Sequence, residues 1–128
     1  MLELDLPSCV EAPSIARAAI NGVCENLDAH ESWLESLRLL VSELVTNAVK
    51  HSHAPSDATI ALHVCLRPDG ARVAVIDQGD GFIPAPRDPA QPGGGYGLYL
   101  VQKLAARWGI EVAEQTRVWF ELPMSLDN

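Results

Sequence analysis

The chain has 128 residues and a formal net charge of -8, from nine Lys+Arg against seventeen Asp+Glu. That length fits a single domain over residues 1–128, which can bury a core without disulfides or metals. The acidic balance argues against a nucleic-acid-binding surface, because such a surface needs clustered cations. No apolar stretch approaches the roughly 20 residues that span a bilayer. The three cysteines stand at no zinc or redox spacing, so we expect a cytoplasmic protein with no membrane or nucleic-acid partner.

The first third of the chain predicts a strand and two helices. Leucines alternate with acids over residues 2–6, which indicates a short strand ended by Pro7. Residues 13–27 predict a helix. Ser32 fits the N-cap of a second helix, with Glu35 as its capping-box partner. The first helix repeats apolar residues at intervals of four (Ile15, Ala19, Val23, Leu27), and the second carries one apolar stripe (Leu37, Leu40, Val41, Leu44, Val45, Ala48).

The middle of the chain predicts a β-hairpin after a loop over residues 51–57. Residues 59–66 alternate in polarity and residues 71–76 are more continuously apolar. Between them stands Pro68-Asp69-Gly70, in which proline fixes φ and glycine supplies a positive φ. We therefore expect two antiparallel strands joined by a tight turn.

The last part predicts a loop, a helix and two strands. Six glycines and four prolines fall between Gly79 and Gly97. Residues 98–108 have helical spacing, with Gly109 as the stop. A strand is expected to start at Val112, and a last one covers residues 118–122. The order predicts an α/β two-layer sandwich, with one mixed, mostly antiparallel sheet and its helices on one face.

Glu43 and Asn47 are the first candidates for chemistry. They stand four residues apart, so they share one helix face beside the apolar stripe. They form either a solvated polar pair or a functional one. In the second case the carboxylate deprotonates a nucleophile and the amide oxygen holds a hard cation such as Mg²⁺.

Two glycine-rich segments are the next candidates. Asp77-Gln78-Gly79-Asp80-Gly81 follows an apolar strand, and it forms either a plain turn or a carboxylate at the bottom of a pocket for a flat base. Pro84 excludes a dinucleotide fingerprint there. Gly93-Gly94-Gly95-Tyr96-Gly97-Leu98 precedes a helix without the Lys-Ser/Thr of a Walker A loop, and it is either a hinge or a phosphate cradle.

Together, these segments resemble the N, G1 and G2 boxes of the GHKL ATPase superfamily, which has the Bergerat fold. The greatest similarity is to the anti-sigma-factor serine kinase group, from about Leu37 to Pro123. The matching stretches run from Ser42 to His51 (SELVTNAVKH), from Val75 to Phe82 (VIDQGDGF), from Gly95 to Val101 (GYGLYLV) and from Val118 to Leu122 (VWFEL).

The resemblance implies ATP and Mg²⁺ as ligands and a role for each matched residue. Asn47 would ligate Mg²⁺, Glu43 would be the general base for a serine hydroxyl, and Asp77 would bind the adenine amine together with Thr116 through water. Lys50 and His51 would either touch phosphate or only cap the helix. Residues 77–97 would form the nucleotide-binding loop and a short ATP lid. Gly79 and Gly81 would line the adenine pocket, and the phosphate segment would comprise Gly93, Gly94, Gly95, Tyr96, Gly97 and Leu98.

Two departures from the family pattern concern catalysis. Gln115 replaces a usual glycine, and the lid carries only Arg87 as a cation, although phosphoryl transfer needs positive charge. His63 and Cys65 share a strand face but lack further ligands, so we interpret them as structural. Trp119 is interpreted as a packing residue or an exposed partner contact.

The resemblance thus implies a serine/threonine protein kinase that regulates transcription by partner switching. It would bind a sigma factor, phosphorylate a small anti-anti-sigma (STAS-type) partner, and form a homodimer. One alternative is a non-catalytic module that binds ATP or only a partner. Another is the detached ATPase domain of a sensor histidine kinase.

Overall fold

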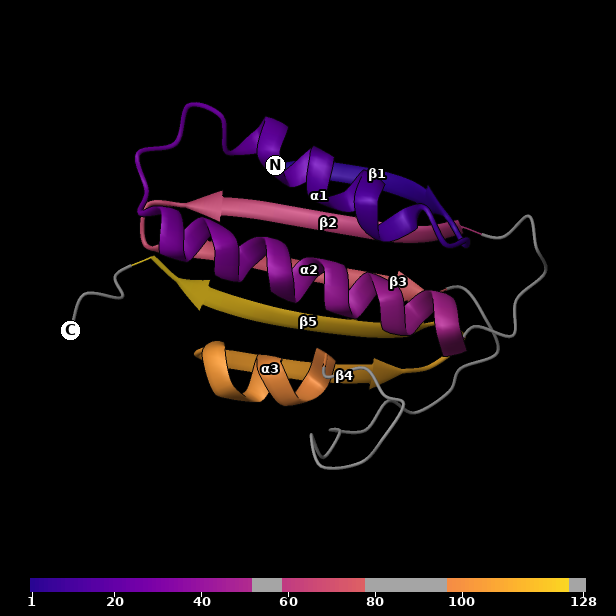
Figure 1. Cartoon of the computed structure of the whole chain (residues 1–128). Coiled ribbons are helices and arrows are strands. Elements are labelled where there is room, and N and C mark those ends of the chain that lie inside the picture. The colour runs from indigo at the N-terminus through magenta and orange to yellow at the C-terminus, as the bar shows by residue number, and fades with distance from the viewer. Residues whose placement is uncertain (52–58, 78–96, 125–128) are drawn as a thin grey trace.

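A computed structural model describes residues 1–51, 59–77 and 97–124 as one antiparallel sheet with helices packed on one face (Figure 1). The strand order is β1-β2-β3-β5-β4, and every strand pairing among these residues is antiparallel. This confirms the two-layer α/β fold class. In chain order the elements are β1 (Leu2–Pro7), α1 (Ala12–Val23), α2 (Glu31–His51), β2 (Thr59–Arg67), β3 (Gly70–Asp77), α3 (Gly97–Leu104), β4 (Arg107–Val112) and β5 (Thr116–Pro123).

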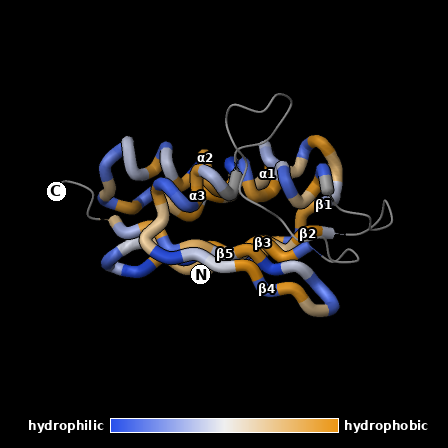
Figure 2. Tube along the Cα trace, turned by 90° about the horizontal axis from the view of Figure 1, so that it is seen from below, coloured by the Kyte–Doolittle hydropathy of each residue, from blue (hydrophilic) through white to orange (hydrophobic). Residues whose placement is uncertain are grey.

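The hydrophobic core fills the space between the sheet and the helices. The predicted stripe of α2 is confirmed, since all six of its apolar residues are buried. Phe120 and Leu122 of β5 lie in the same core cluster. Figure 2 shows the helices on one side of the sheet and none on the other. None of the described helices combines the length and apolar character needed to cross a membrane.

The first helix differs from its prediction in length and in its buried face. α1 ends at Val23, four residues early. The prediction that the stripe starting at Ile15 is the buried face is wrong. Ile15 is 40% exposed, whereas Ala12, Ala16 and Ile20 are fully buried. The small alanine side chains let α1 approach its neighbours closely, which local spacing does not reveal.

The capping box predicted for α2 is wrong. The helix begins at Glu31, so Ser32 lies inside its first turn. The side chain of Trp33, two residues after the helix start, is fully buried and donates a 2.9 Å hydrogen bond from Nε1 to the carbonyl oxygen of Pro123. This long-range contact anchors the start of α2 to the end of β5.

The boundary between α3 and β4 is also wrong in the sequence analysis. The helix ends at Leu104 rather than Trp108, and Gly109 lies within β4 instead of stopping a helix. Val112 ends this strand rather than starting it. Gly109 pairs with Trp119 of β5, and a Cβ atom there would lie 2.7 Å from Trp119 Nε1. Long-range strand pairing therefore overrides the local helical spacing.

The predicted hairpin is confirmed. β2 and β3 pair antiparallel from Ile60–Asp77 to Arg67–Gly70. Gly70 has a φ of +154°, and a Cβ atom at this position would collide with the carbonyl oxygen of Leu122. The turn therefore requires glycine for both its dihedral angle and its close packing on β5.

Candidate functional site

Asp77 and Thr116 form a buried polar pair at one end of the sheet. Asp77 ends β3, Thr116 begins β5, and the two are direct partners in the strand register. Their exposed fractions are 4% and 1%, and they are the only buried polar or charged residues in the described part of the chain. Asp77 lies two residues after the buried Val75 on β3, so its side chain points to the same face of the sheet, toward the helices. Thr116, its register partner on β5, points the same way.

The chemistry of this pair suits recognition of a nitrogen heterocycle. A carboxylate offers two acceptor oxygens, and a threonine hydroxyl both donates and accepts. Burial strengthens hydrogen bonds to such groups, because water competes less for them. A flat ligand with an exocyclic amine could donate a hydrogen bond to such a carboxylate.

Glu43 and Asn47 lie half-buried on one flank of α2. The hydroxyls next to them are used by the helix backbone, since Thr46 Oγ1 donates to the Ser42 carbonyl at 2.7 Å and Ser42 Oγ donates to the Leu39 carbonyl at 3.1 Å. Within residues 1–51, 59–77 and 97–124, neither the Glu43 nor the Asn47 side chain has a hydrogen-bond or ion-pair partner. Both side chains are therefore available to a ligand.

The remaining candidates of α2 and α3 lie near the same end of the molecule. Lys50 is exposed in the last turn of α2, and His51 is its final residue. Figure 1 shows that the last turns of α2, the end of β3, the start of β5 and the start of α3 share one side of the molecule. Gly97 and Leu98 are the first two residues of α3, so the N–H groups of its first turn belong to this end of the fold.

Part of the predicted site lies outside the described residues. This holds for most of the nucleotide-binding loop and lid predicted over residues 77–97. The candidates concerned are Gly79, Gly81, Gly93, Gly94, Gly95 and Tyr96. Their roles stay predictions.

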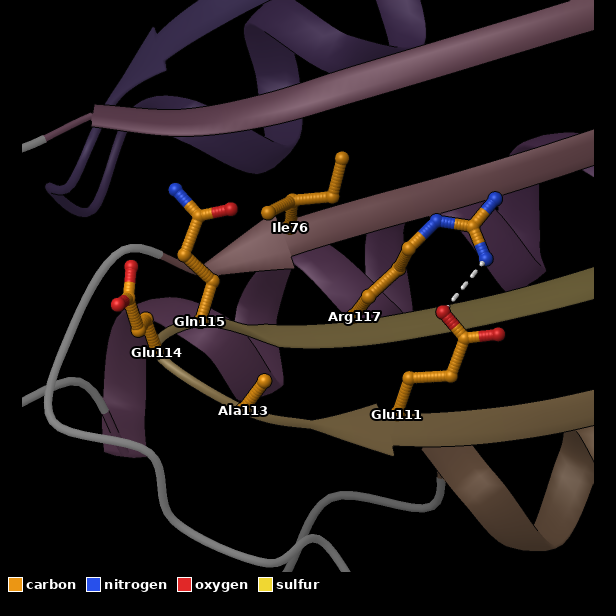
Figure 3. Close-up of a pocket in the computed structure, with 6 residues that line it drawn as sticks. All are labelled: Ile76, Glu111, Ala113, Glu114, Gln115 and Arg117. Atoms are coloured by element: carbon orange, nitrogen blue, oxygen red, sulfur yellow. Dashed lines mark hydrogen bonds and ion pairs between the residues drawn. The ribbon is translucent and has the colours of Figure 1, made fainter.

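A hollow of about 480 Å³ lies close in sequence to the polar pair but on the opposite face of the sheet (Figure 3). Its lining includes Ile76 and Arg117, which directly neighbour Asp77 and Thr116 in sequence and therefore point the other way. Arg117 Nη1 lies 3.4 Å from Glu111 Oε1 across the strands. The sequence analysis missed this ion pair, although the alternation along residues 116–123 could have placed Arg117 outside. The hollow is distinct from the candidate nucleotide site.

His63 and Cys65 lie two residues apart on β2, and their interpretation as structural stays a prediction. Both point away from the helices, as their register with β1 and β3 requires. In the described residues no group of three His, Cys, Asp or Glu side chains could hold a metal ion. Mg²⁺ bound with a nucleotide needs only one or two protein oxygens, because phosphates and water supply the other ligands. The amide oxygen of Asn47 fits that requirement.

Comparison of the sequence with known proteins gives a family. Residues 34–126 match the family described as histidine kinase-, DNA gyrase B-, and HSP90-like ATPase. The chain is 29% identical over 117 residues to the serine-protein kinase RsbW of Staphylococcus epidermidis, covering 80% of this chain and 74% of the relative. It is 27% identical over 116 residues to RsbW of Oceanobacillus iheyensis, covering 80% and 73%.

Solved structures share the fold. A crystal structure of the RsbU and RsbW domains of a Mycobacterium tuberculosis protein matches 94% of this chain with a TM-score of 0.74 and 22% identity. This chain covers 31% of that larger protein. A histidine kinase domain from Erythrobacter litoralis matches 89% of this chain and 60% of its own, with a TM-score of 0.59 and 23% identity.

Proposed function

The chain belongs to the histidine kinase-, DNA gyrase B-, and HSP90-like ATPase family, and from this premise we propose that it binds ATP and phosphorylates a protein serine. The observation that carries the proposal is the buried Asp77–Thr116 pair at the end of the sheet. A carboxylate that is 4% exposed is costly unless it has a role in structure or binding. Its position in the matched family motif favours binding of the adenine amine.

The phosphate end of ATP is assigned to α2 and α3. Asn47 would be the protein ligand of Mg²⁺, which would neutralise charge on the phosphates when bound. The N–H groups of Gly97 and Leu98 at the start of α3 would hold phosphate oxygens, since a helix N-terminus favours anions. Lys50 adds an exposed cation on the same flank of α2 as Asn47.

Glu43 is proposed as the general base. It would accept the proton of a serine hydroxyl as the serine oxygen bonds to the γ-phosphorus, while the bond from that phosphorus to the β–γ bridging oxygen breaks and ADP leaves. Glu43 and Asn47 are one helical turn apart on α2. The base and the metal ligand are therefore held by one rigid element, so their spacing needs no other support.

We propose that the phosphorylated partner is a small anti-anti-sigma (STAS-type) protein, and that a sigma factor is the other partner. The support is the similarity to curated relatives named as serine-protein kinases. Partner switching would then regulate transcription, because phosphorylation would decide which protein this chain binds.

Transfer of labelled γ-phosphate to STAS-type proteins tests this proposal. Wild type should label a serine. Glu43→Ala should lower the rate by about 100-fold or more, as expected for loss of a general base, with ATP affinity unchanged. Glu35→Ala is the matched control, because Glu35 is an exposed acid on the same helix but lies about 12 Å further toward its N-terminus. Equal transfer by wild type and Glu43→Ala would remove Glu43 from the base role. ATP binding without transfer would favour the non-catalytic module, and phosphate on histidine would favour the sensor-kinase domain.

A further inference from the structure

A second hollow, of about 270 Å³, lies on the face of the sheet that no helix covers (Figure 2). Its lining includes Ala74 of β3, which pairs with His63 of β2 on one side and with Trp119 of β5 on the other. The short alanine side chain stands between two large ones on neighbouring strands, so it leaves a depression in this face. Arginines gather around the depression, and we call it the basic hollow.

The basic hollow concentrates positive charge in an acidic chain. The chain has nine Lys+Arg against seventeen Asp+Glu. Arg67, Arg72 and Arg117 all line this one hollow, and Glu3 is the single acid among the described residues of its lining. His63 adds an imidazole that can donate a further hydrogen bond. Such a local excess of cations attracts an anion, although the molecule as a whole repels one.

Two of these arginines are held in place by contacts that leave other donors unused. Arg72 Nη1 lies 3.2 Å from Glu121 Oε2, and the Arg72 guanidinium carbon lies 4.7 Å from the centroid of the Trp119 ring. Arg117 Nη1 lies 3.4 Å from Glu111 Oε1 (Figure 3). Each ion pair involves one nitrogen of a guanidinium group that carries five N–H donors. The two acids thus order the guanidinium groups and leave donors for a ligand.

Arg67 supplies a cation that no acid neutralises. Within residues 1–51, 59–77 and 97–124, its side chain has no ion-pair partner. Arg67 ends β2 two residues after Cys65, and both residues line the basic hollow. A guanidinium group without a carboxylate partner can form a charge-assisted hydrogen bond to an anion without breaking an existing ion pair.

We propose that the basic hollow binds a small organic anion that carries two or more carboxylate or phosphate groups. The planar fork of arginine matches both groups through paired hydrogen bonds. Two or more anionic groups can engage arginines on different strands. The volume of about 270 Å³ is just below the roughly 300–1,000 Å³ of pockets that hold drug-sized molecules, so it fits a ligand of metabolite size. The proposal does not rest on the kinase function, because the buried Asp77–Thr116 pair lies on the opposite face of the sheet.

Alkylation of Cys65 by iodoacetamide reports whether the basic hollow is occupied. Cys65 lines the hollow and is partly buried, whereas Cys9 is partly buried outside it and is the internal control. The full chain is titrated with citrate or with pyrophosphate in EDTA, at constant ionic strength so that screening does not change. At a probe concentration about ten times its Kd, Cys65 should react about tenfold more slowly, because only molecules with an empty hollow react. Cys9 should keep its original rate.

Peptide mass spectrometry measures both rates. Protection of Cys65 by citrate alone would identify a carboxylate ligand, and protection by pyrophosphate alone would identify a phosphate ligand. A probe bound at the nucleotide site leaves this readout unchanged, because Cys65 lies on the other face of the sheet.

Arginine variants test whether the hollow itself binds the probe. Arg72→Gln and Arg67→Gln should each raise the probe concentration for half-maximal protection at least about tenfold, since each removes charge-assisted hydrogen bonds. Arg107→Gln is the matched control. Arg107 lies 3.8 Å from the same Glu121 carboxylate as Arg72 does but is outside the lining of the hollow, so this variant should behave like wild type. Melting curves check that each variant is folded, and Arg67→Gln breaks no ion pair.

Three results would overturn the proposal. The first is no protection of Cys65 by either probe. The second is equal slowing of Cys65 and Cys9, or an equal loss of protection in Arg107→Gln and Arg72→Gln, because either would show a general effect of charge. The third is alkylation of Cys65 as slow as that of the buried Cys24 before any anion is added, because the hollow would then be closed to solvent.

Discussion

At the residue scale, the proposed site depends on single polar groups and not on a general positive field. The chain carries a net charge of -8, so binding of a triphosphate must come from local donors and a cation. Asn47 is the one proposed metal ligand in the described part of the site. Its amide oxygen provides a hard ligand without adding negative charge near the phosphates.

Asn47→Ala should therefore weaken ATP binding mainly when Mg²⁺ is present. Loss of a metal ligand predicts a fall in affinity of roughly 10–100-fold in Mg²⁺, with little change in EDTA. Titration of the variant and wild type under both conditions measures this. An equal loss in Mg²⁺ and in EDTA would indicate that Asn47 touches the nucleotide directly or only supports the helix.

The cysteines give a residue-scale test of the core. Burial raises the pKa of the Cys24 thiol, and the positive charge of Arg38 opposes this shift. Cys24 is 6% exposed, whereas Cys9 and Cys65 are only partly buried. Because the thiolate is the reacting form, iodoacetamide should modify Cys24 roughly tenfold or more slowly than the other two in the native protein. Mass spectrometry of peptides would measure the rate of modification at each cysteine. Equal rates at all three sites would contradict the packing of α1.

At the element scale, tight turns and close contacts between strands determine where the elements of the sheet begin and end more than local propensity does. The turn before β3 was predicted from Pro68-Asp69-Gly70, because each residue type has a specific dihedral role. The end of α3 was not predicted, because the strand that follows depends on Trp119, which is distant in sequence. Local patterns thus located the elements, and long-range pairs decided two of their boundaries.

Two glycine variants separate the effect of the tight turn from the effect of local helix propensity on stability. Gly70→Ala should destabilise the protein by about 1–3 kcal/mol, since alanine is strained at positive φ and its Cβ meets the Leu122 carbonyl. Gly22→Ala in α1 should stabilise it by about 0.5–1 kcal/mol, because nothing lies within 4 Å of the added Cβ. Urea unfolding measures both changes. A stabilising Gly70→Ala would show that the turn is more adaptable than the structure indicates.

At the scale of the whole molecule, the fold class was predictable because the hydrophobic patterns of α2, β2, β3 and β5 are regular. The site was predictable in part. Asp77 follows an apolar strand, and Glu43 and Asn47 share a helix flank by their spacing alone. The burial of Thr116 beside Asp77 required the register of β3 on β5, and the ion pair between Arg117 and Glu111 required the register of β4 on β5. These strand registers cannot be deduced from the local patterns of a single sequence.

Calorimetric titration with ATP and Mg²⁺ tests the central claim most directly. Wild type should bind ATP, and Asp77→Asn should lose at least about 100-fold in affinity, because the variant places an amide donor against the adenine amine. Asp69→Asn, in the turn at the opposite end of β3, is the matched control and should bind like wild type. Absence of any heat or melting-temperature shift in wild type, or equal binding by Asp77→Asn, would contradict the account.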